Sequence, residues 1–404
     1  MRRFYPCRCA CQYLRILTID FYSTFHNNTY MKDFLKTILG VLIIGFIFYY
    51  LIPDIFSPSD TTTPPSTTST PIVIPTTETP SSSLTTTIDV ITSMAVPESQ
   101  STETIDSEFM WDFGGIQWTW SMQIPKAVYD YYKGLPRPPT NNYSIYVTHP
   151  MDDYLINQLA TNIKTNAQEK EYDSLQTVSF AAAFVQSLKY TDDSVTSSYD
   201  EYPRYPFETL VDEGGDCEDT SILMASLIDD LGYGVVIIAF PESADSSGHC
   251  GVGVKVNEGI YGAYYEYNSG KYFYLETTGS GWELGELPEE YHGVSVTIYP
   301  MIPVPILTHD WTIEAEGLYA KLKVTVENLG SSMAEDVYVY AGFDAGNDQI
   351  WNSKESSLFD LGVNESVVVT IYLTPPLGVH TRLIIQIVYN GYAVDESYST
   401  WIDT

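Results

Sequence analysis

The C-terminal part of the chain alternates between apolar and polar side chains. Within 317–330, five apolar residues fall on one face: Leu318, Ala320, Leu322, Val324 and Val326. A period of two predicts a strand with one buried face. The segments DVYVYAGF, ESVVVTIYL and RLIIQIVYNG follow at intervals typical of a sandwich. We therefore predict an immunoglobulin-like β-sandwich over 305–404.

A period close to 3.6 marks the centre of the chain. Two segments between 151 and 188 have helical spacing. In GGDCEDTSILMASLIDDLGYG (214–234), five apolar residues also recur at helical spacing: Ile222, Leu223, Leu227, Ile228 and Leu231. Gly232 lies where a helix commonly ends. This pattern predicts a helix that begins at Cys217.

Three apolar or alternating segments follow this helix. They are VVIIAF (235–240), HCGVGVKV (249–256) and KYFYLETT (271–278). Upstream, 107–150 is rich in Trp and Tyr and predicts a strand and a short helix. A helix followed by antiparallel strands is an α+β arrangement. We therefore expect an α+β fold class, with one domain over 107–300 ahead of the sandwich.

An uncharged apolar run near the N-terminus has the length of a membrane span. Residues 37–52 carry no charge, and with Phe34 and Leu35 the span of 34–53 provides about the 20 residues that a bilayer core requires. Lys32 and Lys36 precede the uncharged residues, and Asp54 and Asp60 follow them. This bias predicts an N-terminal transmembrane helix with the N-terminus inside. We expect a single-pass protein of the cell membrane, with the other domains outside the cytoplasm.

The segments on either side of this span have different compositions. Met31 opens a normal start for an anchored chain, so 1–30 is interpreted as a mis-assigned start. The alternative is a short cytoplasmic tail with lipidated or reduced cysteines. Residues 57–105 are dominated by Thr, Ser and Pro and predict an extended stalk. The sequons at Asn142 and Asn364 suit a location outside the cytoplasm.

Composition excludes several classes of function. The net charge of −33 argues against nucleic-acid binding, which requires a basic face. Five cysteines, without paired CxxC motifs, indicate neither a disulfide scaffold nor a zinc ribbon. The motifs HExxH and GxSxG and the Walker loop are absent from the sequence. Cysteine chemistry is the candidate that remains.

Three residues form a candidate catalytic constellation. Cys217 opens a helix, where backbone N–H groups and the helix dipole favour a thiolate. His249 begins the second predicted strand, and Glu276 lies near the end of the third. If these strands pair antiparallel, His249 can lie beside Glu276. Cys250 points to the opposite face from His249, and we predict that it belongs to the core.

These residues resemble the transglutaminase-like superfamily, whose members share a papain-like core. The resemblance covers roughly 170–290 and is carried by GGDCEDTSILMASL, GHCGVGVKV and YFYLETT, with Glu276 where Asp is commoner. YPFETLVDEGGDCED is similar to a cell-surface branch found in archaea. The resemblance implies acyl transfer by Cys217, His249 and Glu276 on a protein or peptide at the cell surface.

The resemblance leaves the second substrate open. Hydrolysis by a cysteine peptidase or amidase is our first interpretation, and a cross-linking transglutaminase is the alternative. A non-catalytic surface binding or adhesion module on the same fold is the rival from another class. No cofactor is required for any of these functions.

Two further features accompany the constellation. The backbone N–H of Cys217 would supply part of an oxyanion hole, and Gln186 is a candidate for the second donor. Asp216, Glu218 and Asp219 surround the nucleophile and would raise its pKa, which opposes activation. A bound cation would cancel this effect, and similar runs in the superfamily are associated with calcium. The alternative is that these acids cap the helix and favour its dipole.

Overall fold

The computed structural model describes seven ranges of the chain: 86–91, 103–150, 153–193, 202–242, 248–256, 259–346 and 349–404. The predicted tail (1–30) and the predicted span (34–53) lie outside them. No helix in these seven ranges is long and apolar enough to cross a membrane. The expectation of a transmembrane helix therefore has no support from the structure.

More of the described residues lie in strands than in helices. Strands account for 42% of them and helices for 23%, and the sheets are almost entirely antiparallel. The expected α+β class is therefore wrong, since the fold is mostly β. Two features raise the share of residues in strands. The C-terminal domain contains only strands, and the aromatic segment before the helices forms a long hairpin in place of one strand.

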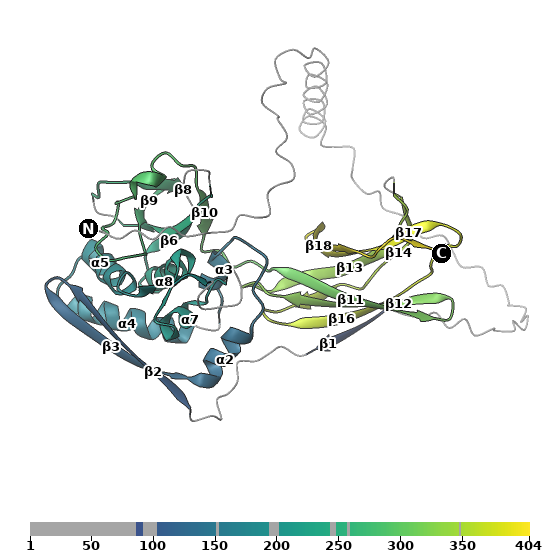
Figure 1. Ribbon diagram of the computed structural model, residues 1–404, viewed down its shortest axis with the longest axis horizontal. Coiled ribbons are helices and arrows are strands. Elements are labelled where there is room, and N and C mark those ends of the chain that lie inside the picture. The colour runs from purple at the N-terminus through teal and green to yellow at the C-terminus, as the bar shows by residue number, and fades with distance from the viewer. Residues whose placement is uncertain are drawn as a thin grey trace, which may run out of the picture. The chain divides into compact units, whose positions relative to one another are not determined.

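The helices of the first domain gather around α8 (Cys217–Asp230), which is buried from Cys217 to Ile228. Figure 1 shows α8 among its neighbours. The other helices are α2 (Lys126–Gly134), α3 (Ser144–Val147), α4 (Asp153–Glu169), α5 (Ser174–Val185) and α7 (Pro206–Val211). Gly232, with φ of 87°, ends α8 in the left-handed conformation as the pattern predicted.

A five-stranded antiparallel sheet packs on α8. Its strand order is β10–β6–β7–β9–β8. The strands are β6 (Gly234–Phe240), β7 (His249–Lys255), β8 (Tyr264–Tyr267), β9 (Gly270–Leu275) and β10 (Thr297–Pro300). One face contributes to the main core with the helices, and the other carries a small cluster that includes Phe240, Tyr274 and Tyr291. Tyr291 belongs to the short helix η1 (Glu289–Tyr291).

Two smaller β elements complete this domain. The hairpin of β2 (Thr104–Phe113) and β3 (Ile116–Pro125) places Phe109 and Trp111 against Phe184 of α5 at centroid distances of 5.4 and 5.1 Å. Strand β4 (Lys189–Tyr190) pairs in parallel with β5 (Gly214–Gly215), which lies directly before α8 in the chain. A Cβ on Gly214 would lie 2.1 Å from the carbonyl oxygen of Lys189, so this approach requires glycine.

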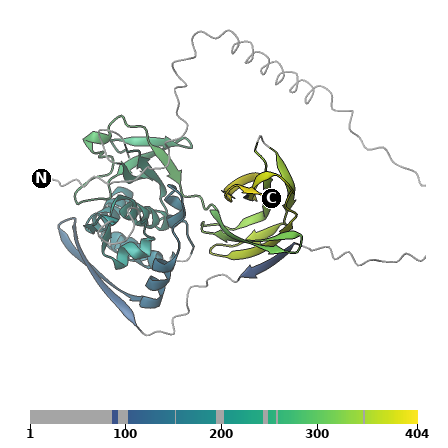
Figure 2. The same cartoon turned by 45° about the vertical axis from the view of Figure 1, so that its right-hand side comes forward.

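The second domain consists of two antiparallel sheets around one apolar core. The first has the order β1–β16–β12–β11, and the second has β14–β13–β17–β18 with β15 and β19 attached. The sheets face each other in Figure 2. The strands are β1 (Thr87–Ile91), β11 (Leu307–Glu316), β12 (Tyr319–Asn328), β13 (Ala334–Asp344), β14 (Ile350–Glu355), β15 (Phe359–Leu361), β16 (Ser366–Leu373), β17 (His380–Tyr389), β18 (Tyr392–Tyr398) and β19 (Ile402–Asp403).

Strand β1 differs from the expectation for its segment. It falls inside the predicted stalk of 57–105, yet it pairs antiparallel with β16 along its whole length. The sequence TIDVI alternates and is rich in β-branched residues, which favours a strand within a Thr-rich background. The rest of the predicted stalk up to 102 lies outside the described residues.

Candidate active site

His249 and Glu276 are joined by a short hydrogen bond. Strands β7 and β9 pair antiparallel, with Val252 opposite Leu275, which brings the start of one strand to the end of the other. Nε2 of His249 lies 2.8 Å from Oε2 of Glu276, and both side chains are fully buried. Glu276 follows the last residue of β9 and so can turn toward the imidazole. The expected pairing of these two residues is present, through Nε2 of the ring rather than Nδ1.

Both carboxylate oxygens of Glu276 are saturated with donors. Oε1 accepts the backbone N–H groups of Thr277 (3.0 Å) and Thr278 (2.9 Å) and the hydroxyl of Thr278 (2.7 Å). Oε2 accepts the hydroxyl of Tyr274 at 2.8 Å in addition to His249. Burial alone would raise the pKa of Glu276, but the charge and hydrogen bonds of His249 and Thr278 lower it. The site therefore holds this carboxyl group as an anion.

Aromatic rings enclose the imidazole of His249. Tyr291 stacks on it with a centroid distance of 5.0 Å and an interplanar angle of 15°. Phe240 lies on the neighbouring strand with its centroid at 6.1 Å. With the ring plane fixed by stacking and Nε2 bound to Glu276, the direction of Nδ1 is also fixed.

Cys217 lies at the first position of α8 and is fully buried. Sγ of Cys217 lies 3.3 Å from Oε2 of Glu218. Cys250, another cysteine of the described residues, is a free thiol. Activity as a nucleophile requires that Cys217 be reduced.

The first turn of α8 is fastened to both strands of the His–Glu pair. The hydroxyls of Thr220 and Ser221 each lie 3.0 Å from the hydroxyl of Thr277, the residue after Glu276. On the other strand, Cys250 bonds to Ser221. Cys250 is fully buried, and this burial raises its pKa well above the usual range, as fits a core thiol. The helix that begins at Cys217 is thus held beside His249 and Glu276.

Gln186 ends α5 and is buried against the loop after β9. Its Nε2 donates to the carbonyl oxygens of Glu276 (2.7 Å) and Trp282 (3.2 Å). Its Oε1 accepts the N–H of Gly281 at 3.2 Å. Both amide hydrogens therefore bind main-chain groups. An oxyanion role for Gln186 stays a prediction and requires that one of these bonds be exchanged for substrate.

Asp219 is paired with a buried arginine. Its Oδ1 accepts the backbone N–H of Arg204 at 2.7 Å, and its Oδ2 forms an ion pair with Nη1 of the same residue. Oδ2 also accepts the N–H of Asp216 at 3.2 Å, which satisfies a donor at the start of α8. Arg204 is fully buried and also contacts Asp193 at 2.9 Å and Asp212 at 3.1 Å. The cationic partner of Asp219 is thus a protein side chain.

The other two acids beside Cys217, Asp216 and Glu218, form a group with Asp193. One oxygen from each of Asp193, Asp216 and Glu218 lies within 4.8 Å of the other two, and all three residues are buried. Burial, followed by the charges of Glu218 and Asp219, raises the pKa of Asp216 well above its usual range. Burial and the charge of Asp219 raise the pKa of Asp193 to about 7. Arg204 offsets part of this negative charge through Asp193, and shared protons or a bound cation would offset the rest.

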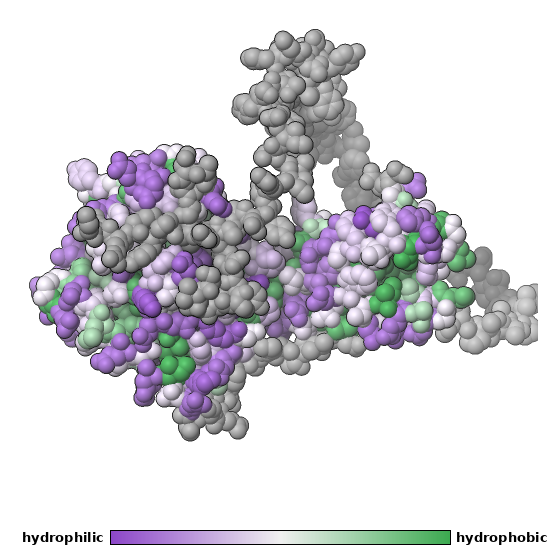
Figure 3. Space-filling model, in the orientation of Figure 1, coloured by the Kyte–Doolittle hydropathy of each residue, from purple (hydrophilic) through white to green (hydrophobic). Residues whose placement is uncertain are grey.

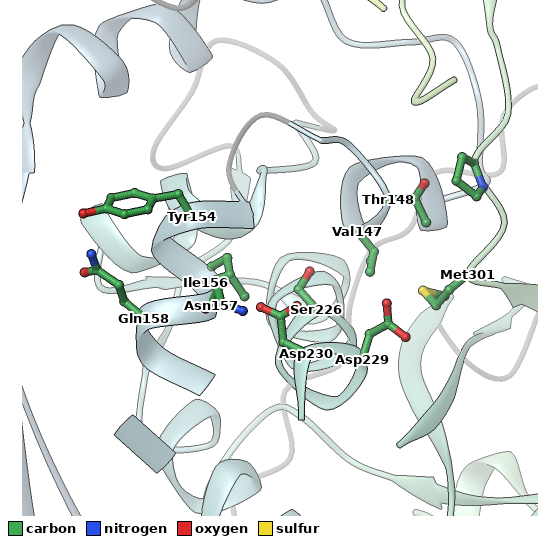
Figure 4. Close-up of a pocket in the computed structure, with 11 residues that line it drawn as sticks. Val147, Thr148, Tyr154, Ile156, Asn157, Gln158, Ser226, Asp229, Asp230 and Met301 are labelled. Carbon is green, nitrogen blue, oxygen red and sulfur yellow. The ribbon is translucent and has the colours of Figure 1, made fainter. Parts of the chain in front are cut away.

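A cavity of about 600 Å³ lies at the opposite end of α8. Figure 4 shows Ser226, Asp229 and Asp230 of α8 together with α4 residues around it. A rise of about 1.5 Å per residue puts about 18 Å between Cys217 and Asp229. None of the predicted catalytic residues lines this cavity. We place the candidate site by the paired side chains, since a cavity alone carries no chemistry.

The exposed surface adds no second candidate on the face seen in Figure 3, where apolar residues form small separate groups among hydrophilic ones. The structure does add residues to the site that sequence reasoning missed. Tyr274 had a usable signal, because it lies two residues before Glu276 and therefore on the same face of the strand. Asp193 and Arg204 had none, because no local periodicity shows that they come within hydrogen-bond distance of each other and of Asp219.

Comparisons with known proteins give limited similarity. No protein-family profile matches the chain, and no curated protein matches it. Among solved structures, a transglutaminase from red sea bream is similar over 74% of this chain and 62% of its own, with 11% identity and a TM-score of 0.20. The chain thus spans less than two thirds of that enzyme.

Two other solved structures match only a quarter of the chain. A CARDB domain from Pyrococcus furiosus, in complex with di-metal ions, matches 24% of this chain and 87% of its own, with 18% identity and a TM-score of 0.19. A calcium-binding mutant of a Bacteroides uniformis β-glucuronidase matches 24% of this chain and 13% of its own, with 13% identity and a TM-score of 0.18. At such scores these similarities carry no argument about function.

Proposed function

We propose that the chain is a thiol enzyme that catalyses acyl transfer, with Cys217 as nucleophile, His249 as acid and base, and Glu276 as the group that orients His249. The observation that carries this proposal is the buried His249–Glu276 pair, in which the carboxylate has a donor at every side. A buried anion of this kind stabilises an imidazolium and fixes its orientation. The helix of Cys217 is fastened to both strands of the pair.

The proposed reaction begins with the Cys217 thiolate. Its sulfur attacks the carbonyl carbon of an amide, and the backbone N–H at the start of α8 stabilises the resulting oxyanion. The C–N bond then breaks as Nδ1 of His249, the ring nitrogen that faces away from Glu276, protonates the leaving amine. Water attacks the thioester while His249 takes its proton. The C–S bond then breaks, the carboxylic acid leaves, and the thiolate is restored beside the protonated His249.

The acid group beside the nucleophile supports a cation at the same site. Glu218 lies 3.3 Å from Sγ, so its negative charge disfavours the thiolate. Oδ1 of Asp216 is buried and has no hydrogen-bond partner among the described residues. Asp193, Asp216 and Glu218 offer the oxygen ligands that calcium prefers. Calcium held by these three carboxylates would cancel the opposing charge and leave Asp219 with Arg204.

Hydrolysis of a protein or peptide is our first proposal for the overall reaction. A lysine amine in place of water would make a cross-linking transglutaminase, and the same three residues would serve. We further propose a location outside the cytoplasm, which the sequons at Asn142 and Asn364 suit. A membrane-spanning helix is not part of this proposal.

The test compares the wild-type chain with Cys217→Ala and with the matched control Cys250→Ala. Each reduced protein is incubated with casein and a fluorescent amine, with and without calcium. We expect peptide release or amine incorporation that Cys217→Ala abolishes and Cys250→Ala retains. Peptide release indicates hydrolysis, and amine incorporation indicates cross-linking. Equal activity of wild type and Cys217→Ala would refute the proposal.

A non-catalytic binding module is the second candidate. One observation favours it: Cys217, His249 and Glu276 are all buried, so a substrate reaches the sulfur only if the surrounding chain moves. In that case the reduced thiol would react with iodoacetamide no faster than a free cysteine. Fast, selective alkylation of Cys217 in the reduced native protein would exclude this candidate.

A further inference from the structure

Tyr274 contacts Glu276, the carboxylate proposed to orient His249, from within the sheet. It is fully buried on β9, and its hydroxyl donates to Oε2 of Glu276 at 2.8 Å. The same oxygen binds Nε2 of His249, also at 2.8 Å. One carboxylate oxygen is therefore shared by the imidazole and the phenol. The two donors compete for the same negative charge.

The position of the Tyr274 ring depends on a glycine in the strand of His249. A Cβ on Gly251 would lie 2.6 to 2.8 Å from the ring carbons and the hydroxyl of Tyr274. Only glycine leaves room for the ring to cross β7 at this point. Phe240 contacts the same ring edge-on, with a centroid distance of 5.8 Å. The ring is therefore confined on two sides.

The main chain of Tyr274 is held equally firmly. Its N–H donates to Ala263 at 3.0 Å, and its carbonyl accepts the N–H of Gly285 at 2.7 Å. Burial and the nearby charge of Glu276 raise the pKa of the phenol well above its usual range. The hydroxyl therefore stays protonated and acts toward the carboxylate as a donor.

We propose that Tyr274 is a positioning residue of the candidate active site: its hydroxyl orients the Glu276 carboxylate and moderates the negative charge that this group presents to His249. This inference rests on the proposed function, because it assigns a role in the same Cys–His–Glu reaction. Tyr274 acts through Glu276 and does not touch the reacting atoms. Its effect is on the charge state of the imidazole.

The proposal predicts the direction of the effect that loss of the Tyr274 hydroxyl has on the reaction. Without the hydroxyl, the charge of Glu276 is less compensated and favours the protonated imidazole more strongly. In a plot of rate against pH, the fall in rate at high pH (the alkaline limb) then occurs at a higher pH for any reaction that requires the imidazolium. A purely structural role for Tyr274 would lower stability and leave this limb in place.

The experiment measures alkylation of Cys217 by iodoacetate as a function of pH, without any substrate. This anionic reagent reacts fastest while a protonated imidazole lies beside the thiolate. The full chain is reduced, freed of reductant and labelled, and the Cys217 peptide is quantified by mass spectrometry. Wild type is compared with Tyr274→Phe, with the matched control Tyr272→Phe on the same face of β9, and with His249→Ala. We expect Tyr274→Phe to move the alkaline limb upward by about half a pH unit to one unit. Tyr272→Phe should leave it unchanged.

The outcomes separate this inference from the proposed function. A Tyr274→Phe profile that coincides with those of wild type and Tyr272→Phe, while His249→Ala loses the limb, overturns the role of Tyr274 alone. A wild-type profile that His249→Ala does not change shows that Cys217 and His249 are not coupled, and both proposals then fail. Thr278→Val, which removes the 2.7 Å hydroxyl bond to Oε1, provides a second variant if Tyr274→Phe does not fold.

Discussion

Glu276 occupies a position where the resemblance led us to expect the shorter Asp. Its longer side chain reaches past the end of β9 to His249 and still turns back to the N–H groups of Thr277 and Thr278. Five donors around one buried carboxylate leave no polar atom of this group unsatisfied. Such saturation allows an anion to exist in a dry site, where an unpaired charge would be very costly.

Replacing this anion by a neutral amide is the sharpest test at the residue scale. In Glu276→Gln the NH₂ group must face donors on one side, so at least one of them loses its partner. We expect turnover to fall by about 10²- to 10³-fold in the casein assay. Glu266→Gln, at an exposed position on β8, is the control and should keep full activity. Equal activity of the two variants would remove Glu276 from the mechanism.

The lowered pKa of Glu276 also sets a pH dependence. A carboxyl group with a folded pKa below its unfolded value stabilises the fold above the unfolded pKa, about 4.3. This contribution is lost as the pH falls through the folded pKa. We therefore expect acid unfolding of the wild type to steepen below about pH 4 and to be less steep in Glu276→Gln. Circular dichroism during acid titration of both proteins measures the difference.

At the scale of elements, the contact of β7 with β9 depends on Gly251. A methyl group there overlaps the Tyr274 ring, and overpacking of this kind costs about 1 to 3 kcal/mol. We expect Gly251→Ala to lower the melting temperature and to move the alkaline limb of Cys217 alkylation upward as in Tyr274→Phe, because the ring must withdraw from Glu276. Gly259→Ala, where a Cβ meets nothing within 4 Å, is the matched control. Similar melting and alkylation of both variants would contradict this account.

The sandwich has a polar link between its two sheets. His309 on β11 bonds to Asp395 (2.7 Å) and Ser397 (2.6 Å), both on β18. These strands lie at the edges of the two sheets. Burial alone would raise the pKa of Asp395, but the hydrogen bond and charge of His309 lower it. These three hydrogen-bonded side chains thus connect the two sheets at their edge strands.

Removal of this link should destabilise the sandwich. We expect His309→Ala to lower the free energy of unfolding by about 1 to 2 kcal/mol, since two partly buried partners lose their bonds. The difference should shrink below about pH 4, because Asp395 then becomes protonated in both proteins. His380→Ala breaks the exposed pair with Asp403, whose side chains are 64% and 89% exposed, and should have little effect. Denaturant titration with a sandwich-specific probe compares them.

At the scale of the whole molecule, charge is the dominant feature. The acidic side chains that give the net charge of −33 repel one another in any compact state, and salt screens this repulsion. In the buried group of Asp193, Asp216 and Glu218, the same repulsion acts between three neighbouring carboxyl groups. General screening and specific cation binding should therefore both stabilise the chain, and they can be separated.

We expect sodium chloride to raise the melting temperature gradually, and calcium to raise it further at matched ionic strength. Asp193→Asn should remove the calcium-specific part and keep the response to sodium chloride. Asp173→Asn, an exposed helix cap distant from the group, should keep both responses. Differential scanning calorimetry of the three proteins makes the comparison. If calcium and sodium chloride act alike on the wild type, the cation site does not exist.

Periodicity was a good guide to individual elements and a poor guide to the fold class. The spacing that begins at Cys217 and the alternation that begins at His249 predicted α8 and β7 with correct first residues. The class was wrong because a Trp-rich segment expected as one strand forms the β2–β3 hairpin, and because β1 emerges from a Thr-rich segment. The partners of a strand lie far away in sequence, so the local pattern of apolar and polar residues does not reveal how many strands a sheet contains.

The identities and order of Cys217, His249 and Glu276 could be recognised from sequence, because a helix start and two alternating strands leave local patterns. Their partners could not. Tyr274 reaches Glu276 only because Gly251 on another strand lacks a side chain, and Asp219 pairs with Arg204 rather than with its neighbours in the acidic run. Hydrogen bonds and ion pairs act over about 3 Å in space whatever the separation along the chain. Folding alone decides which groups come within that distance.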